Sequence, residues 1–213
     1  MRLPQNWRSA PVTIAIAAVT GLAWLVVAAL GLDYQAAMWG GFIPARIDPA
    51  GGAAALAPVL LTPLTATLVH GGLMHVAFNL IFLLFCGRSV EPILGSRGLL
   101  ILYLVGAYVG AGAQYLIDPH SAVPMIGASG AISAVLGAYA MLFGKNRVKV
   151  ANPTLALWLH VLWLAAAWIG LQLLVGFAFT PGGEGIAVAA HIGGFIAGLA
   201  LAKPLLLLKW RGA

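Results

Sequence analysis

Ser129 is the residue whose type and setting in this chain most clearly suggest chemistry. It lies between Gly127 and Gly130, in a run of small residues at positions 127–137 of an otherwise apolar chain. Small residues let membrane helices approach closely, and serine bonds its own backbone at little cost, so packing is the simpler interpretation of this run alone. Inside a bilayer, however, polar groups are costly and indicate functional sites.

A second polar stretch makes a functional interpretation stronger. His75 and Asn79 are four residues apart, so on a helix they share one face, one turn above the other. His70 precedes His75 by five residues with two glycines between them, and we expect it in the loop or at the helix cap. An amide and two imidazoles are therefore expected close together.

The third polar stretch contains His191 within a face of small residues. The members of that face follow one another at spacings of four, three and four: Ala187, His191, Gly194 and Gly198. A matching small stripe contains Ser129, Ser133 and Gly137. Two such stripes allow close backbone approach, which a hydrogen bond between Ser129 and His191 requires.

A serine and a histidine at hydrogen-bond distance predict nucleophilic catalysis. Serine is a weak nucleophile until a neighbouring base takes its proton, and His191 can be that base. No third member of a triad is visible, because all five carboxylates are placed in loops or at their edges: Asp33, Asp48, Glu91, Asp118 and Glu184. The residues therefore permit a dyad of Ser129 and His191.

The same reaction needs donors for the negative charge that develops on the attacked carbonyl oxygen. Pro124 and Gly127 break the approach to Ser129, so we expect this residue at or near a helix start, where backbone N–H groups are unpaired. The Ser129 N–H would act together with the side chains of His75 and Asn79. Loss of one such donor typically costs about a hundred- to a thousand-fold in rate.

The composition is that of a polytopic membrane protein. Of 213 residues, 62% are hydrophobic and 8% are charged, and the mean hydropathy is +1.01, so too few charges are available to cover a soluble fold. The formal net charge is +6, but the basic residues lie in short patches between apolar runs, which gives no reason to expect a nucleic-acid partner. The single cysteine, Cys86, lies in an apolar run and is expected to pack there.

The apolar runs predict six transmembrane helices, at residues 11–32, 73–85, 99–117, 125–143, 154–179 and 186–208. The first run exceeds the roughly 7–15 apolar residues of a cleaved signal peptide, so we expect an uncleaved helix. The long connection at residues 33–69 contains Trp39 and apolar patches and is expected in the membrane interface. After Gly87 we expect an aqueous loop that contains Arg88 and Glu91.

The loop charges predict the orientation of this bundle. When loops alternate between two sides, only Arg46 falls on one side, and the other basic residues fall on the opposite side: Arg2, Arg8, Arg88, Arg97, Lys145, Arg147, Lys149, Lys203, Lys209 and Arg211. The positive-inside rule then makes both termini cytoplasmic. His70, Ser129 and the start of the last helix would lie near the outer face. No repeat or linker divides the chain, which favours a single domain over residues 1–213.

These motifs resemble those of the rhomboid family of intramembrane serine proteases. The resemblance covers residues 68–202, and its motifs occur in the expected order on the second, fourth and sixth predicted helices. The serine motif alone is weak, but its conjunction with two histidine motifs is highly specific: Gly127-Ala-Ser129-Gly130, His70-x4-His75-x3-Asn79 and His191-x2-Gly194-x3-Gly198.

The resemblance implies a fold, an activity and roles for these residues. It implies an all-α bundle of six transmembrane helices, with cleavage of membrane protein substrates in or near their transmembrane segments, toward the outer face. Ser129 would be the nucleophile, His191 the base, and His75 and Asn79 the oxyanion donors. Supporting roles fall to His70, Gly127, Gly130, Gly194 and Gly198. No cofactor or metal is implied, and we expect a multi-pass protein of a bacterial inner membrane.

The chain departs from the family pattern at two positions. Many relatives have a Trp-Arg pair in the first loop, where this chain has Pro63 and Leu64. Many also have a tyrosine four residues after the nucleophile, on which the histidine ring stacks; here the residue is Ser133, so the ring must be oriented in another way. Glu91 resembles a structural acid that braces the cytoplasmic end of the bundle, and a solvated loop charge is the alternative.

Three other functions fit parts of the pattern. A small transporter would need intramembrane carboxylates or paired broken helices, and neither is evident. A zinc site could use the imidazoles of His70, His75 and His191, although the His-Glu-x-x-His pattern is absent. An inactive rhomboid-like binding or chaperone protein is the third alternative, but every expected reactive group is present.

Overall fold

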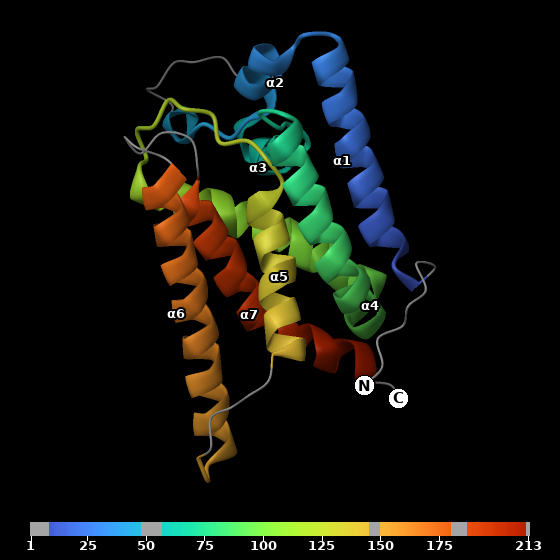
Figure 1. The fold of residues 1–213 in the computed structure, drawn as a ribbon, viewed down its shortest axis with the longest axis vertical. Helices are drawn as coiled ribbons and strands as arrows, with labels where there is room; N and C mark the ends of the chain where they lie inside the picture. The colour runs from blue at the N-terminus through green and yellow to red at the C-terminus, as the bar shows by residue number, and fades with distance from the viewer. Residues whose placement is uncertain (1–8, 48–56, 145–149, 180–186, 212–213) are drawn as a thin grey trace.

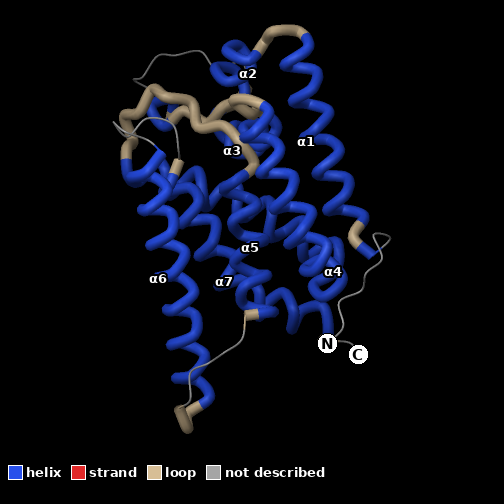
Figure 2. Tube along the Cα trace, viewed as in Figure 1, coloured by secondary structure: helices blue, strands red, loops and turns tan. Residues whose placement is uncertain are grey.

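The computed structural model describes residues 9–47, 57–144, 150–179 and 187–211, which are mostly helical (Figure 1 and Figure 2). The α-helices are α1 (Pro11–Ala29), α2 (Asp33–Gly40), α3 (Thr62–Thr65), α4 (Leu73–Ile117), α5 (Ser129–Phe143), α6 (Pro153–Phe179) and α7 (Val188–Trp210). α4, α5 and α7 pack on one another, α1 covers α4, and α6 lies at the edge of the bundle beside α7.

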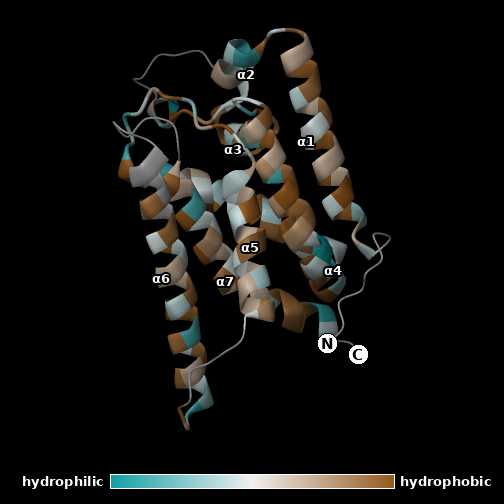
Figure 3. Ribbon diagram, in the orientation of Figure 1, coloured by the Kyte–Doolittle hydropathy of each residue, from teal (hydrophilic) through white to brown (hydrophobic). Residues whose placement is uncertain are grey.

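Within the part of the chain that the structure describes, four helices are long and apolar enough to cross a membrane: α1, α4, α7 and, within α6, Pro153–Leu171. α5 is also apolar but has only 15 residues. Large apolar side chains are exposed on the bundle, among them Leu22, Phe78 and Trp163, and hydrophobic residues predominate along the long helices (Figure 3). Because such a surface suits lipid rather than water, the chain is a multi-pass helical membrane protein.

The helix α4 contains both the second and the third predicted helix. Gly95 interrupts it with φ 78° and ψ 162°, a conformation that glycine adopts readily because it has no Cβ. Leu83 and Tyr103, on either side of Gly95, lie in one core cluster, so the chain folds back on itself there. The predicted aqueous loop after Gly87 is wrong, because the helix continues to Leu94.

The hydrogen bonds of Glu91 explain why the part of α4 after Gly87 is helical and largely buried although it contains charged residues. Its carboxylate is 1% exposed and accepts hydrogen bonds from the Val12 N–H (3.0 Å), the Thr13 N–H (2.8 Å) and the Thr13 hydroxyl (2.7 Å). The Ser96 hydroxyl donates to it as well, at 2.7 Å. The first N–H groups of a helix have no partner within that helix, and an acid is favourable there. Glu91 therefore braces the start of α1, and the solvated-loop alternative is wrong.

Glycines bring α5 and α7 into backbone contact. A Cβ on Gly194 would collide with the Gly130 carbonyl, and a Cβ on Gly198 with the Ala134 carbonyl. Gly137 faces the backbone of α7 in the same way. The two small-residue stripes therefore meet, as the sequence predicts.

The described parts of the connection from α1 to α4, residues 30–47 and 57–72, fold over the end of the bundle that carries Ser129 (Figure 1). The backbones of Phe42 and Met125 exchange two hydrogen bonds, of 2.9 and 2.8 Å, and the Gly127 N–H donates to the Ala66 carbonyl at 2.9 Å. Phe42 and Ala66 are both buried. This connection therefore fixes the segment that leads into Ser129, while its predicted place in the membrane interface stays a prediction.

Several residues used in the sequence predictions lie outside the described residues. They include the basic residues of the N-terminal segment and of the connection after α5, two of the carboxylates, and the expected start of the last helix: Arg2, Arg8, Lys145, Arg147, Lys149, Asp48, Glu184 and Ile186.

The Glu91 brace predicts a large effect on stability. Glu91→Ala should lower the free energy of unfolding by about 2–4 kcal/mol, because hydrogen bonds to a charged group contribute roughly 1.5–3 kcal/mol each and those at Glu91 act together. Thermal unfolding in detergent measures this change. Asp33→Ala, which removes an exposed carboxylate from α2, is the matched control. Equal unfolding temperatures for Glu91→Ala and wild type would contradict the brace.

Candidate active site

Ser129 is the first residue of α5. Gly127, two residues earlier, has φ +106°, which ends the preceding extended segment, and Ala128 occupies the N-cap without a side-chain hydrogen bond. The first N–H groups of a helix have no intrahelical partners and point away from its start. The start of α5 thus combines a hydroxyl with backbone donors, as predicted.

His191 lies in the first turn of α7, opposite Ser129. Its Nε2 is 2.7 Å from the Ser129 Oγ. With the ring proton on Nδ1, Nε2 accepts the hydrogen bond from the serine hydroxyl, which is the arrangement a general base needs. The structure thus brings together two residues that are 62 positions apart in the chain.

His75 lies against the segment that precedes Ser129. Its Nδ1 accepts a hydrogen bond of 3.4 Å from the Gly71 N–H, so Nε2 carries the proton when the ring is neutral. A Cβ on Gly127 would lie 2.6 Å from that Nε2. The absence of a side chain at Gly127 therefore makes room for the His75 donor beside the start of α5.

Asn79 is buried one turn further along α4. Its Nδ2 donates to the His75 carbonyl at 2.8 Å, and its Oδ1 is buried without a hydrogen-bond partner. One amide hydrogen is thus used within α4 and a second is available. No hydrogen bond joins Asn79 to Ser129 in this structure, so its role as an oxyanion donor stays a prediction.

His70 supports the loop that carries the serine. It is 2% exposed, its Nε2 accepts the Ala128 N–H at 3.4 Å, and its ring meets that of His75 edge-on at 5.0 Å. Burial, together with the nearby His75, lowers the pKa of His70 to about 4, so the ring is neutral at pH 7. A neutral ring can accept the Ala128 hydrogen bond, and His70 thereby holds the residue next to Ser129.

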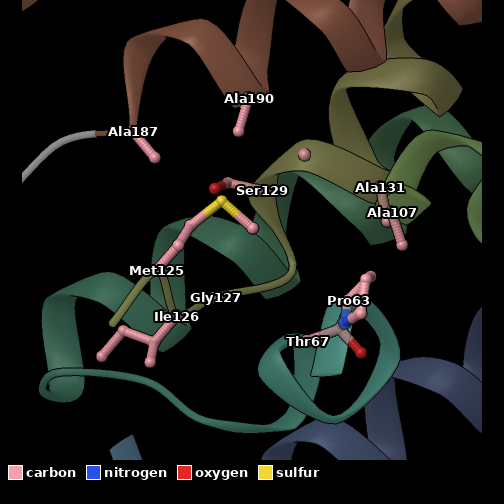
Figure 4. Close-up of a pocket in the computed structure, with 11 residues that line it drawn as sticks. Pro63, Thr67, Ala107, Met125, Ile126, Gly127, Ser129, Ala131, Ala187 and Ala190 are labelled. Atoms are coloured by element: carbon pink, nitrogen blue, oxygen red, sulfur yellow. The ribbon is translucent and has the colours of Figure 1, made fainter. Parts of the chain in front are cut away.

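A small cavity opens beside Ser129, with about 260 Å³ of empty space that includes open solvent. Met125, Ala187 and Ala190 lie around the serine, and Pro63 and Thr67 form the opposite wall (Figure 4). Sequence reasoning did not place Pro63, Thr67 or Met125 at the site. Their approach depends on how the loop after α1 folds, which no local pattern in the chain reveals.

Trp158, Trp163 and Trp168 are five residues apart, a spacing that favours lipid-facing or packing roles over a cofactor site. Trp158 and Trp163 are exposed, as lipid-facing residues would be, and Trp168 packs by stacking on Phe195. The spacing did not indicate that Trp168 also donates a hydrogen bond to the His191 carbonyl. Five residues rotate a helix by about 500°, so the three indoles point in different directions.

No group of three His, Cys, Asp or Glu side chains within the described ranges is arranged to hold a metal ion. The three imidazoles of the zinc alternative are nonetheless near this site: His70 and His75 pack together, and His191 faces Ser129.

The fold and site define a class of protein, a helical membrane bundle with a serine and an imidazole paired at the start of two helices. The family model described as Rhomboid domain matches residues 59–208, which is more than half of the chain. The chain belongs to the rhomboid family.

Named relatives agree with this assignment. The chain is 34% identical to the Rhomboid protease GluP of Bacillus subtilis over 145 residues, which are 68% of this chain and 26% of that protein. It is 33% identical to the Rhomboid protease GlpG of Pectobacterium atrosepticum over 137 residues, 63% of this chain and 45% of that protein. Identity to the Rhomboid-related protein 2 of Mus musculus is 29% over 135 residues, 63% and 44% of the two chains. The chain thus spans less than half the length of these relatives.

The contact between Gly127 and His75 predicts a loss of activity on adding one methyl group. Under the hypothesis that Ser129 cleaves peptide bonds, Gly127→Ala should lower the cleavage rate about 100-fold, because displacement of a reacting group by about 1 Å costs that much. The matched control is Gly112→Ala, where the added Cβ meets nothing within 4 Å. Cleavage rates of the two purified variants, compared with wild type, make the test. Equal rates for Gly127→Ala and Gly112→Ala would disprove the tight fit around His75.

Proposed function

We propose that this chain is an intramembrane serine protease that uses Ser129 and His191 as a catalytic dyad. The observation that carries the proposal is the 2.7 Å contact between the Ser129 Oγ and the His191 Nε2. Membership of the rhomboid family and the protease names of two relatives support the same reaction. Five further residues of the three motifs are proposed to support the dyad: His70, Gly127, Gly130, Gly194 and Gly198.

The first half of the proposed reaction forms an acyl-enzyme. The Ser129 Oγ attacks the carbonyl carbon of the scissile peptide bond while the His191 Nε2 takes the hydroxyl proton. The carbonyl oxygen becomes an oxyanion, which the Ser129 N–H, the His75 Nε2–H and the Asn79 amide stabilise by hydrogen bonds. When the intermediate collapses, the C–N bond breaks and His191 gives its proton to the leaving amine.

The second half regenerates the enzyme. Water attacks the acyl carbon, His191 takes a proton from that water, and the Ser129 Oγ leaves with the proton that His191 returns. Both half-reactions require only residues that are already at the start of α5, α4 and α7, so no cofactor is part of this mechanism.

We further propose a topology for this reaction. The two halves of α4 together with α1, α5, α6 and α7 make six spans in a single domain. Both termini are cytoplasmic in this arrangement, as the basic loop residues indicate. Glu91 then braces the cytoplasmic end, and Ser129 lies toward the outer face of a bacterial inner membrane.

The proposed substrates are transmembrane segments of other membrane proteins. The cavity beside Ser129 is lined in part by small residues, including Gly130, Ala131 and Ala187. A small residue at the cleaved bond fits such a cavity. Because the substrate backbone must become extended to reach Ser129, segments that unwind easily should be preferred, and glycine lowers helix stability by about 1 kcal/mol per residue.

The dyad predicts that its two members act as a unit. Ser129→Ala and His191→Ala should each abolish cleavage of a reconstituted transmembrane substrate, and the double variant should be no worse than either single one. Asn79→Ala should retain partial activity, because the other oxyanion donors remain. Chelators should have no effect on the rate. Full cleavage by Ser129→Ala, or chelator inactivation that added zinc reverses, would favour a different mechanism or a metal site.

Substrate unwinding predicts a preference between two designed segments. A transmembrane helix with a central Gly-Ser pair should be cut at least about ten-fold faster than a poly-leucine helix of equal length, because it becomes extended at lower cost. Gel-based cleavage rates in liposomes measure the ratio. Equal rates for both segments would show that helix unwinding does not limit this enzyme.

A further inference from the structure

Trp168 connects α6 to the part of α7 that carries His191, and α6 lies at the edge of the bundle beside α7 (Figure 1). Its indole Nε1–H donates to the His191 carbonyl at 3.3 Å. Its ring also stacks on Phe195, with centroids 5.0 Å apart and planes 17° apart. His191 and Phe195 are one turn apart on α7. A single side chain therefore contacts two successive turns of the catalytic helix.

This part of α7 packs on α4 as well as on α5, with Ala190 against Gly110 and Gly193 against Val109 and Ala113, and on the side that faces α6 it meets Trp168. The helix begins at Val188, with Ala187 at the N-cap, and no side chain caps it. Within the described residues no aromatic ring packs on the His191 imidazole. Ser133 is buried beside Gly194 where α5 meets α7, and its side chain has no ring that could pack on the imidazole. The orientation of His191 thus depends on how the backbone of α7 is held.

We infer that Trp168 is a positioning residue for His191, which it holds through the backbone of α7 rather than through the imidazole. This inference rests on the proposed dyad. The hydrogen bond from the indole N–H fixes the position of the His191 carbonyl relative to α6. The stack on Phe195 fixes the rotation of α7 about its axis. Both contacts act on the 2.7 Å distance between Ser129 and His191, and a displacement of about 1 Å there costs roughly 100-fold in rate.

If Trp168 positions His191, its removal should lower the rate of cleavage, whereas removal of a side chain that blocks substrate entry should raise it. If Trp168 served to close the gap between α6 and the bundle, its removal would admit substrate more readily and raise the rate or lower KM. A positioning residue acts on kcat instead, because the substrate still binds while the base is misplaced. The two roles therefore separate in kinetics on a purified protein.

The test uses the full chain in liposomes with a transmembrane substrate. Trp168→Phe keeps a ring for the stack but removes the N–H, and should lower kcat about 3- to 10-fold, the range of one net hydrogen bond. Trp168→Ala removes both contacts and should lower kcat about 100-fold. KM should stay within about twofold in both variants. Trp163→Phe changes an exposed indole on the same helix and should leave kcat unchanged.

The outcomes separate the inference from the proposed function. If wild type cuts no substrate, or cuts it equally well as Ser129→Ala, the proposed function is wrong. If wild type is active and Trp168→Ala has the same or a higher kcat, or raises KM alone, the inference is wrong and the dyad stands. Thermal unfolding shows whether Trp168→Ala fails to fold. If it does, the kcat of Trp168→Phe is compared with that of Trp163→Phe instead. Equal kcat values for these two variants would overturn the inference.

Discussion

The close approach of α5 and α7 is the constraint on which the rest of the site depends. The Ser129 side chain reaches His191 only because the helices that carry them touch through their backbones, at Gly194 against Gly130 and at Gly198 against Ala134. In lipid, apolar side chains give no hydrophobic driving force between helices, so such packing contacts must provide the attraction. Small residues therefore determine the catalytic geometry as much as the reactive groups do.

A polar site inside an apolar bundle also requires that its groups be paired. Burial of an unpaired polar group is costly, and the structure meets this requirement with local partners. His70 accepts the Ala128 N–H, the Asn79 amide donates to the His75 carbonyl, and Glu91 binds the start of α1 at the opposite end. Two polar atoms of these residues are buried without a hydrogen-bond partner, the Asn79 Oδ1 and the His70 Nδ1. Unpaired polar atoms of this kind fit a site that is completed only when a ligand binds.

Motif spacing predicted which polar residues come together, because the chemistry that it suggests constrains a few residue types at helical intervals. The pairing of Ser129 with His191 and the position of His75 follow from such intervals, and the structure places these residues together. Apolar runs likewise predicted the helices. The errors come from interactions between residues far apart in the chain. The resemblance favoured a bracing role for Glu91, but the local sequence also allowed a solvated loop charge, because its partners on α1 are 79 and 78 positions away.

The same reason explains what the sequence did not predict about α6 and the loop after α1. Trp168 resembles its exposed neighbours until Phe195 on another helix is placed against it. Pro63 reaches the cavity only through the fold of the loop, and its position in the family pattern did not indicate that it lines the site. Helical periodicity shows on which face of a helix a residue lies. Which residues pack against that face depends on how the helices are arranged in the bundle.

The claim that Ser129 is the nucleophile and that His191 activates it is tested most directly by locating a covalent adduct. Purified protein would be treated with a fluorophosphonate, digested and mapped by mass spectrometry. We predict one phosphonylated residue, Ser129, with no adduct at Ser121 or Ser133, and loss of that adduct in His191→Ala. An adduct at another residue, or undiminished labelling of Ser129 when His191 is absent, would contradict the dyad.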